Sequence, residues 1–175
     1  LISRMVKLSM RNLSKNLSKV LIRYKNLSDM GDLAKDINSS FPSEHVKALI
    51  NIKYTANYLD QIGSAMLKPY EISEPQYNIL RILRGAGKAI TVNQVKERMV
   101  QKSPNTTRLM DKLCEKSLIR RTRCENDRRV VYIEILEKGK NLLEKIRFDD
   151  FNQYMKQLSK AEAKQLNTLL DKIRK

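Results

Sequence analysis

A cluster of polar and charged side chains between residues 102 and 112 has the spacing of a nucleic-acid contact. Thr106, Leu109, Met110 and Leu113 fall at i, i+3, i+4 and i+7, which is the pattern of one buried helical stripe. The opposite face and the segment leading into it then present the side chains suited to DNA: Lys102, Ser103, Pro104, Asn105, Thr107, Arg108 and Lys112. Side chains near the start of a helix lying in a major groove reach base edges, and those at its margins reach phosphates.

These side chains differ in what they could contact. Arg108 could pair with a guanine edge, and Pro104 or the Thr107 methyl group could meet a thymine methyl group. Phosphate contacts suit Lys102, Ser103 and Lys112. The alternative is that Asn105 and Thr107 only satisfy hydrogen bonds at the helix start and that Arg108 is a solvated charge. Because a carboxylate repels phosphate, we expect the outward-facing Asp111 to pair with a neighbouring arginine.

The residues around this helix predict a winged helix. Ser103 is a natural N-cap, and Pro104 suits the first helical position. Residues 118–123 and 130–136 have the alternation of two strands, joined by the turn formers Glu125-Asn126-Asp127. Two arginines, Arg128 and Arg129, follow the turn at once. An amphipathic helix followed by an arginine-tipped hairpin is typical of proteins that read DNA.

The segment from Thr91 to Gly139 resembles the MarR family of winged helix-turn-helix regulators. The matching pieces are Asn105-Thr106-Thr107-Arg108-Leu109-Met110-Asp111-Lys112-Leu113, Leu118-Ile119, Asp127-Arg128-Arg129 and Gly139. The resemblance implies that Arg129 enters a minor groove, that Arg128 lies on the DNA backbone, and that Asp127 orients the arginine. Ser117 departs from the pattern, because the family has glycine after the recognition helix, where a left-handed residue is needed.

The resemblance also implies an architecture and a mode of action. The fold class is mainly α with a small β-hairpin wing: residues 43–175 form a MarR-type domain, with the winged helix-turn-helix at 73–136 and a helical dimerisation region at 43–68 and 138–175. Such proteins act as homodimers on pseudo-palindromic operators, and many are repressors released by small, lipophilic ligands. Aromatic side chains that could line an effector pocket, or equally belong to the core, are His45, Tyr54, Tyr58 and Tyr70.

The flanking sequence supplies helices in the expected order. Residues 44–66 form one long amphipathic pattern, and Ser73-x-x-Gln76 and Thr91-x-x-Gln94 are capping boxes that predict two helix starts. The first of these two helices is expected to end at Gly85-Ala86-Gly87. After the wing we expect a long helix from Gly139 to about Leu158, and Ser159-x-x-Glu162 predicts a last helix.

Composition limits the class of function. The chain has 175 residues with a formal net charge of +16, which favours a polyanionic partner such as double-stranded DNA. Neither a phosphate-binding glycine loop nor a nucleophile motif occurs, so we do not expect an enzyme or a cofactor. Two alternatives stay open: a winged helix that binds a protein partner as an adaptor, and a nonspecific DNA-associated protein.

Residues 1–42 are interpreted as a basic extension outside the regulator domain. The first 28 residues carry seven Lys or Arg and no acid. They fit a basic amphipathic helix, a targeting peptide, or a segment foreign to the functional protein. We favour the third interpretation, with Met30 as the start of the functional chain.

The remaining signals concern cysteine, metal and membrane. Cys114 and Cys124 do not suggest a disulfide framework, which favours a reducing, cytoplasmic setting. We do not expect either thiol to sense oxidants. One histidine and two separated cysteines give no zinc spacing, and no apolar run approaches the ~18 residues of a membrane span.

Overall fold

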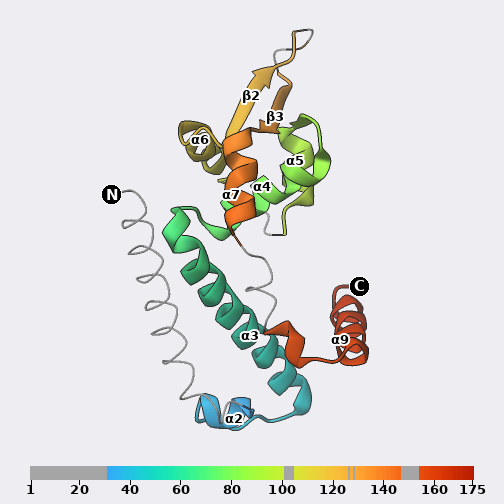
Figure 1. The fold of residues 1–175 in the computed structure, drawn as a ribbon. Helices are drawn as coiled ribbons and strands as arrows, with labels where there is room; N and C mark the ends of the chain where they lie inside the picture. The colour runs from blue at the N-terminus through green and yellow to red at the C-terminus, as the bar shows by residue number, and fades with distance from the viewer. Residues whose placement is uncertain (1–30, 101–104, 126, 128, 147–153) are drawn as a thin grey trace, which may run out of the picture. The chain divides into compact units, whose positions relative to one another are not determined.

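The computed structural model describes residues 31–100, 105–125, 127, 129–146 and 154–175, drawn as the coloured ribbon of Figure 1. These fall into two compact units, Leu1–Glu74 and Pro75–Lys175, which are described separately. The basic segment of residues 1–28 and the proposed start at Met30 lie outside the described residues.

The first unit is built around one long helix. Helix α2 spans Leu33–Asp36, helix α3 spans Glu44–Leu67, and the 3-10 turn η1 spans Lys68–Tyr70. The Ser43 hydroxyl accepts a hydrogen bond from the Val46 amide, so the long helix starts where the sequence predicts. None of the helices in the described residues is both long and apolar enough to cross a membrane.

The second unit contains most of the helices: α4 (Glu74–Ala86), α5 (Val92–Arg98), α6 (Thr106–Glu115), α7 (Glu137–Lys145), the 3-10 turn η2 (Met155–Gln157) and α9 (Lys160–Ile173). Two of the three predicted capping boxes, at Thr91 and Ser159, have side-chain and backbone hydrogen bonds in each direction. Helix α4 begins at Glu74, directly after Ser73, where the third box predicts a helix start. Helix α4 ends as predicted, because Gly87 adopts a left-handed backbone with φ of 63°.

A three-stranded antiparallel sheet forms the wing and its base. Strands β1 (Ile90–Thr91), β2 (Ile119–Arg123) and β3 (Val131–Ile135) lie in the order β1-β3-β2. Ile119 pairs with Ile135 and Arg123 with Val131, so the predicted hairpin is confirmed to within one residue at each end. Ile90 pairs with Ile133, which adds a short third strand that the sequence did not indicate.

Aliphatic side chains from every element of the winged helix-turn-helix meet in one core. Leu80 of α4, Val95 of α5, Met110 and Leu113 of α6, and Ile133 of β3 are completely buried. Thr106 is also buried, and its hydroxyl lies 3.7 Å from the Met99 sulfur. The predicted inner stripe of α6 is therefore its core face, and the opposite face of the helix is left for a partner.

Two helix boundaries differ from the prediction. Helix α6 begins at Thr106 with Asn105 at the N-cap, whereas Ser103 and Pro104, the expected cap and first helical residue, lie outside the described residues. The expected helix from Gly139 to Leu158 is wrong in extent. Helix α7 starts at Glu137 and stops at Lys145, because Ile146 takes an extended backbone with ψ of 101°.

A compact turn joins α6 to the wing. Ser117 has a left-handed φ of 56°, its amide donates to the Cys114 carbonyl, and the Leu118 amide donates to the Leu113 carbonyl. These two bonds form a Schellman motif, in which Leu113 and Leu118 are both buried. The left-handed site inferred from the departure at Ser117 is confirmed, and the chain tolerates a side chain there.

Candidate nucleic-acid interface

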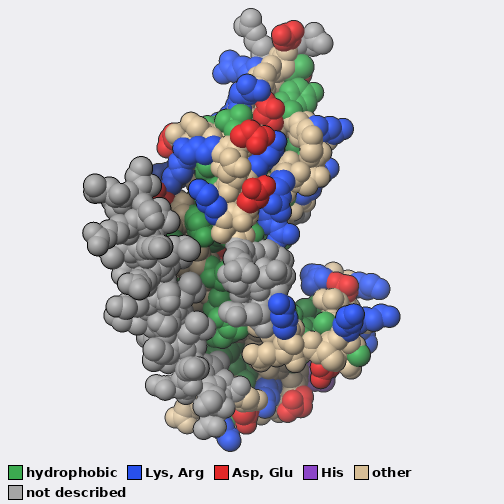
Figure 2. Space-filling model, in the orientation of Figure 1, with side chains coloured by type: hydrophobic (Ala, Val, Ile, Leu, Met, Phe, Trp, Pro, Cys, Tyr) green, Lys and Arg blue, Asp and Glu red, His purple; other side chains and the backbone are tan. Residues whose placement is uncertain are grey.

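The outer face of α6 presents four of the predicted contact residues to solvent. Asn105, Thr107, Arg108 and Lys112 are exposed, whereas Thr106 between them is buried. Figure 2 shows Lys and Arg side chains over the hairpin and the helices beside it, with Asp and Glu side chains among them. An exposed polar helix face flanked by positive charge is the arrangement that a DNA major groove accepts.

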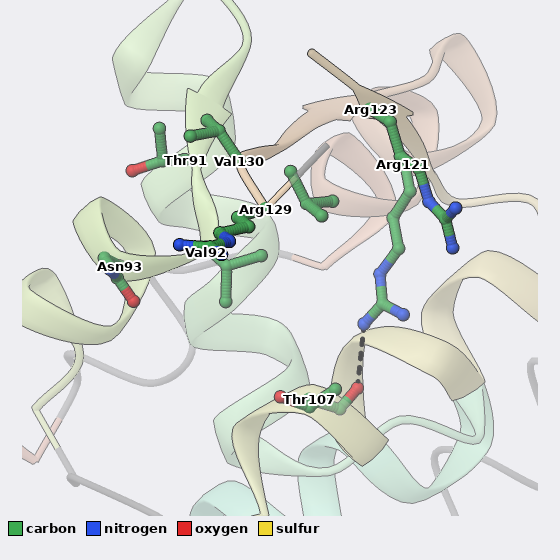
Figure 3. A pocket seen from close by; sticks show the side chains of 9 residues that line it. Thr91, Val92, Asn93, Thr107, Arg121, Arg123, Arg129 and Val130 are labelled. Carbon is green, nitrogen blue, oxygen red and sulfur yellow. Dashed lines mark hydrogen bonds between the residues drawn. The ribbon is translucent and has the colours of Figure 1, made fainter. Parts of the chain in front are cut away.

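One arginine on the wing holds this helix by two separate groups. The Arg121 guanidinium on β2 forms an ion pair with Asp111 on α6 and donates a second hydrogen bond to the Thr107 carbonyl at 3.0 Å. Figure 3 shows Arg121 extending from the strand to Thr107. We call this set (Arg121, Asp111 and the Thr107 carbonyl) the Arg121 bridge. The expected pairing of Asp111 with an arginine is confirmed.

The bridge fixes the outer face of α6 relative to the hairpin. Asp111 lies one helical turn after Thr107, so the two planar N–H groups of one guanidinium hold two points of the helix. The side chains of Arg121 and Asp111 are 29% and 47% exposed. The bridge is therefore mainly a geometric restraint, because partly solvated ion pairs contribute little net stability.

The turn of the wing is ordered by Asp127. Its carboxylate accepts a hydrogen bond from the Arg129 amide at 2.9 Å, and its carbonyl accepts from the Val130 amide. The Cys124 amide in turn donates to the Val130 carbonyl. Asp127 thus fixes the backbone from which the Arg129 side chain projects.

A groove of about 550 Å³ lies between the hairpin and the start of α6. Three arginines line it, Arg121 and Arg123 from β2 and Arg129 from the turn, together with the polar side chains of Thr91, Asn93 and Thr107. We call this the wing groove. Arg123 and Asn93 are absent from the residues that the sequence singled out, although alternation along β2 from Arg121 could have indicated Arg123.

Several predicted site residues fall outside the described part of the chain. These are Lys102, Ser103 and Pro104 before α6 and Arg128 in the wing. Their contacts with DNA stay predictions.

The residues of the expected effector pocket are spread along the first unit. His45 is exposed at the start of α3, and Tyr54, Tyr58 and Tyr70 are half-buried. At about 1.5 Å per residue, α3 separates His45 from its own last residue, Leu67, by roughly 33 Å. One copy of the helix therefore does not bring His45 and Tyr70 to a common small-molecule site, whereas Tyr54 and Tyr58 lie one turn apart.

The two cysteines are free thiols rather than a disulfide. Burial raises the pKa of the Cys114 thiol above its ordinary value, and the nearby Arg121 only partly opposes this shift. A thiol with a raised pKa forms less of the reactive thiolate near neutral pH. In the described residues, no group of His, Cys, Asp and Glu side chains could hold a metal ion.

Comparison with known proteins gives consistent matches to one family. Residues 72–131 match the model of the MarR family. The uncharacterized HTH-type transcriptional regulator YsmB of Bacillus subtilis is 29% identical over 109 residues, which is 62% of this chain and 74% of the relative. The HTH-type transcriptional regulator PecS of Dickeya dadantii is 22% identical over 160 residues, or 89% and 96% of the two chains.

A solved structure shares the fold over most of the chain. It is a mutant MarR from E. coli complexed with operator DNA, with a TM-score of 0.63 and 25% identity. The match covers 82% of this chain and 99% of the E. coli protein.

Proposed function

Because this chain belongs to the MarR family of winged helix-turn-helix transcriptional regulators, we propose that it reads a specific operator as a homodimer and represses transcription in the cytoplasm until an effector releases it. It is a DNA-binding regulator and not an enzyme. The observation that carries the proposal is the Arg121 bridge, which holds the exposed face of α6 beside a basic wing.

In this proposal α6 lies in the major groove of the DNA, and the tip of the wing lies in the minor groove. Arg108 and Thr107 face base edges in the major groove, Lys112 neutralises a phosphate, and Arg129 enters the adjoining minor groove. The proposed DNA contact also includes five residues on the basis of the sequence pattern alone: Lys102, Ser103, Pro104, Asn105 and Arg128. The E. coli protein's complex with operator DNA supports this mode of binding.

The size of the reading surface and the apolar residues left exposed support the proposed homodimer. One winged helix reads few base pairs, and a two-fold dimer doubles the site. Leu169 and Ile173 of α9 are 51% and 67% exposed, and Leu49 of α3 is 56% exposed. Exposed apolar side chains on one helix face favour burial against a second copy. Tyr54 and Tyr58 are the side chains we propose for effector contact.

The test is fluorescence anisotropy with labelled DNA from upstream of the regulator's own gene, beside a scrambled duplex of equal length. Both are titrated across a salt series with the wild-type protein and with Arg129→Ala. We expect tight binding that prefers the upstream sequence, and a loss of about 1–3 kcal/mol with Arg129→Ala at unchanged folding stability.

The alternatives give different results in the same experiment. Equal binding to both duplexes that falls steeply with salt would indicate a nonspecific DNA-associated protein driven by net charge. Binding to neither duplex, together with capture of a protein partner, would indicate an adaptor. Wild-type affinity in Arg129→Ala would remove the wing from the reading surface.

A further inference from the structure

We propose that the wing groove is a subsite for the DNA backbone, in which Arg123 and Asn93 contact phosphates of one strand from opposite sides of the groove, between the two reading elements. The inference rests on the proposed function, since it requires α6 and the wing tip to enter neighbouring grooves. It adds two residues of a defined role to the reading surface: contact with the strand that separates those grooves.

Strand geometry puts Arg123 on the inner face of the hairpin. Side chains alternate between the two faces of a strand, so Ile119, Arg121 and Arg123 share one face of β2. Exposure rises along this face, from the buried Ile119 through the half-buried Arg121 to the exposed Arg123. The face that packs on the core therefore continues toward the wing tip as a row of arginines.

The arginines of the groove are not equivalent. Arg121 is occupied by Asp111 and the Thr107 carbonyl. Among the described residues, neither Arg123 nor Arg129 forms an ion pair, and the Asn93 side-chain amide has no hydrogen-bond partner. A groove that gathers two uncompensated guanidinium groups and a free amide presents mainly hydrogen-bond donors and positive charge, which suits an anion.

The geometry of duplex DNA supplies that anion. A recognition helix fills the major groove, and a wing arginine enters the minor groove next to it. The sugar-phosphate backbone is the boundary between these grooves, so it must cross the protein between α6 and the wing tip. The wing groove occupies this interval, because its lining includes Thr107 of α6 and Arg129 of the wing turn.

The variant Arg123→Ala tests the subsite, with Arg120→Ala as its matched control. Arg120 is an arginine of the same strand on the opposite face, where it pairs with Glu134 at 2.7 Å. Arg123→Ala is expected to weaken binding to the operator and to scrambled DNA by a similar factor, about tenfold near 50 mM salt. It should also lower the slope of log affinity against log salt concentration by about one. Arg120→Ala should leave both quantities close to wild type. Asn93→Ala should weaken binding to both duplexes by a smaller factor than Arg123→Ala does.

A chemical change in the DNA then locates the contact. Neutral methylphosphonates are introduced one at a time along the operator backbone of each half-site. A methylphosphonate at the subsite should weaken DNA binding by the wild-type protein. It should not change DNA binding by Arg123→Ala, because the arginine that would contact this phosphate is already absent. Arg120→Ala should respond to the methylphosphonate at the subsite as the wild-type protein does. Circular dichroism should show unchanged helix content in every variant.

The outcomes separate the subsite from the broader function. Operator preference in the wild type, with additive methylphosphonate effects at every position in Arg123→Ala, would overturn the subsite and leave the regulator intact. Loss confined to the operator duplex would also overturn it, since Arg123 would then read bases. Absence of any operator preference in the wild type would instead overturn the proposed function.

Discussion

The basic residues of the wing divide into structural and available charges. Arg120 pairs with Glu134, and Arg121 pairs with Asp111, so these guanidinium groups restrain the hairpin and α6. Arg123 and Arg129 line the wing groove without an acidic partner in the described residues. The formal net charge of +16 already counts these two pairs as neutral, so the charge that a phosphate backbone would meet at this surface comes from the unpaired arginines.

Sequence patterns predicted part of this division. An outward carboxylate on a helix predicted to face DNA needs a compensating cation, which is why pairing of Asp111 with an arginine was foreseeable. The identity of Arg121 was not, because it depends on how β2 packs against α6. Met110 of α6 and Ile133 of β3 are both completely buried, but local spacing shows only which face of each element is apolar and not which residues of the two elements meet.

Ser117 gives the first prediction at this scale. It holds a left-handed backbone with φ of 56°, which strains a residue bearing a Cβ atom. Ser117→Gly should raise the free energy of unfolding by about 0.5–1 kcal/mol, since the relieved strain exceeds the added freedom of the unfolded chain. Chemical denaturation measures the change. Ser117→Ala, which keeps the Cβ atom, should show no gain, and an equal gain in both variants would contradict the explanation.

At the scale of elements, short-range signals predicted some helix starts and missed the start of α6, which has Asn105 as its N-cap. The capping boxes at Thr91 and Ser159 are local motifs, and both are present. Strand β1 was not foreseen, because two residues are too few to show a period of two, and its pairing with Ile133 is a long-range contact. The end of α7 was also missed, because the apolar period of the sequence includes Ile146, whereas the helix stops at Lys145.

The contact between α7 and the turn after α6 carries the second prediction. A Cβ atom on Gly139 would lie 2.4 Å from the Leu118 carbonyl oxygen and 2.8 Å from Ile135 Cγ1. Gly139→Ala should therefore lower the free energy of unfolding by about 1–3 kcal/mol, because backbone would have to shift. Thermal and urea unfolding measure this.

Gly85→Ala is the control. Gly85 lies near the end of α4, and the position that an alanine Cβ atom would take there is open space, so the change should be neutral or stabilise by up to about 1 kcal/mol. Equal effects at Gly85 and Gly139 would mean that helix propensity rather than close packing decides both.

At the scale of the molecule, the sequence indicated the family fold because its evidence is distributed over the whole winged helix-turn-helix. Three features of the sequence each limit the possible folds: the recognition helix, the hairpin and the order of the flanking helices. The structure has all three. The effector pocket could not be predicted in the same way. Aromatic residues on an amphipathic helix have the same spacing whether they bind a ligand or fill a core.

The third prediction concerns assembly. Leu169→Lys combined with Ile173→Lys on α9 should weaken the dimer at least tenfold while leaving each chain folded, because both side chains are exposed in the single chain. Sedimentation velocity across a concentration series measures the dimer. Asn167→Lys, at an exposed position that the helical period turns away from Leu169 and Ile173, should leave the dimer intact. Monomers in the wild type would contradict the homodimer.

The Arg121 bridge has a consequence for how such regulators diverge after gene duplication. The guanidinium holds residue 107 by its main-chain carbonyl, a group that every amino acid supplies. Residue 107 can therefore be substituted, and the base preference changed, while the hydrogen bond from Arg121 still fixes the position of α6. Asp111 has no such freedom, since its own carboxylate is the second anchor. Paralogues descended from this chain should vary first at 107 and 108 and last at 111 and 121.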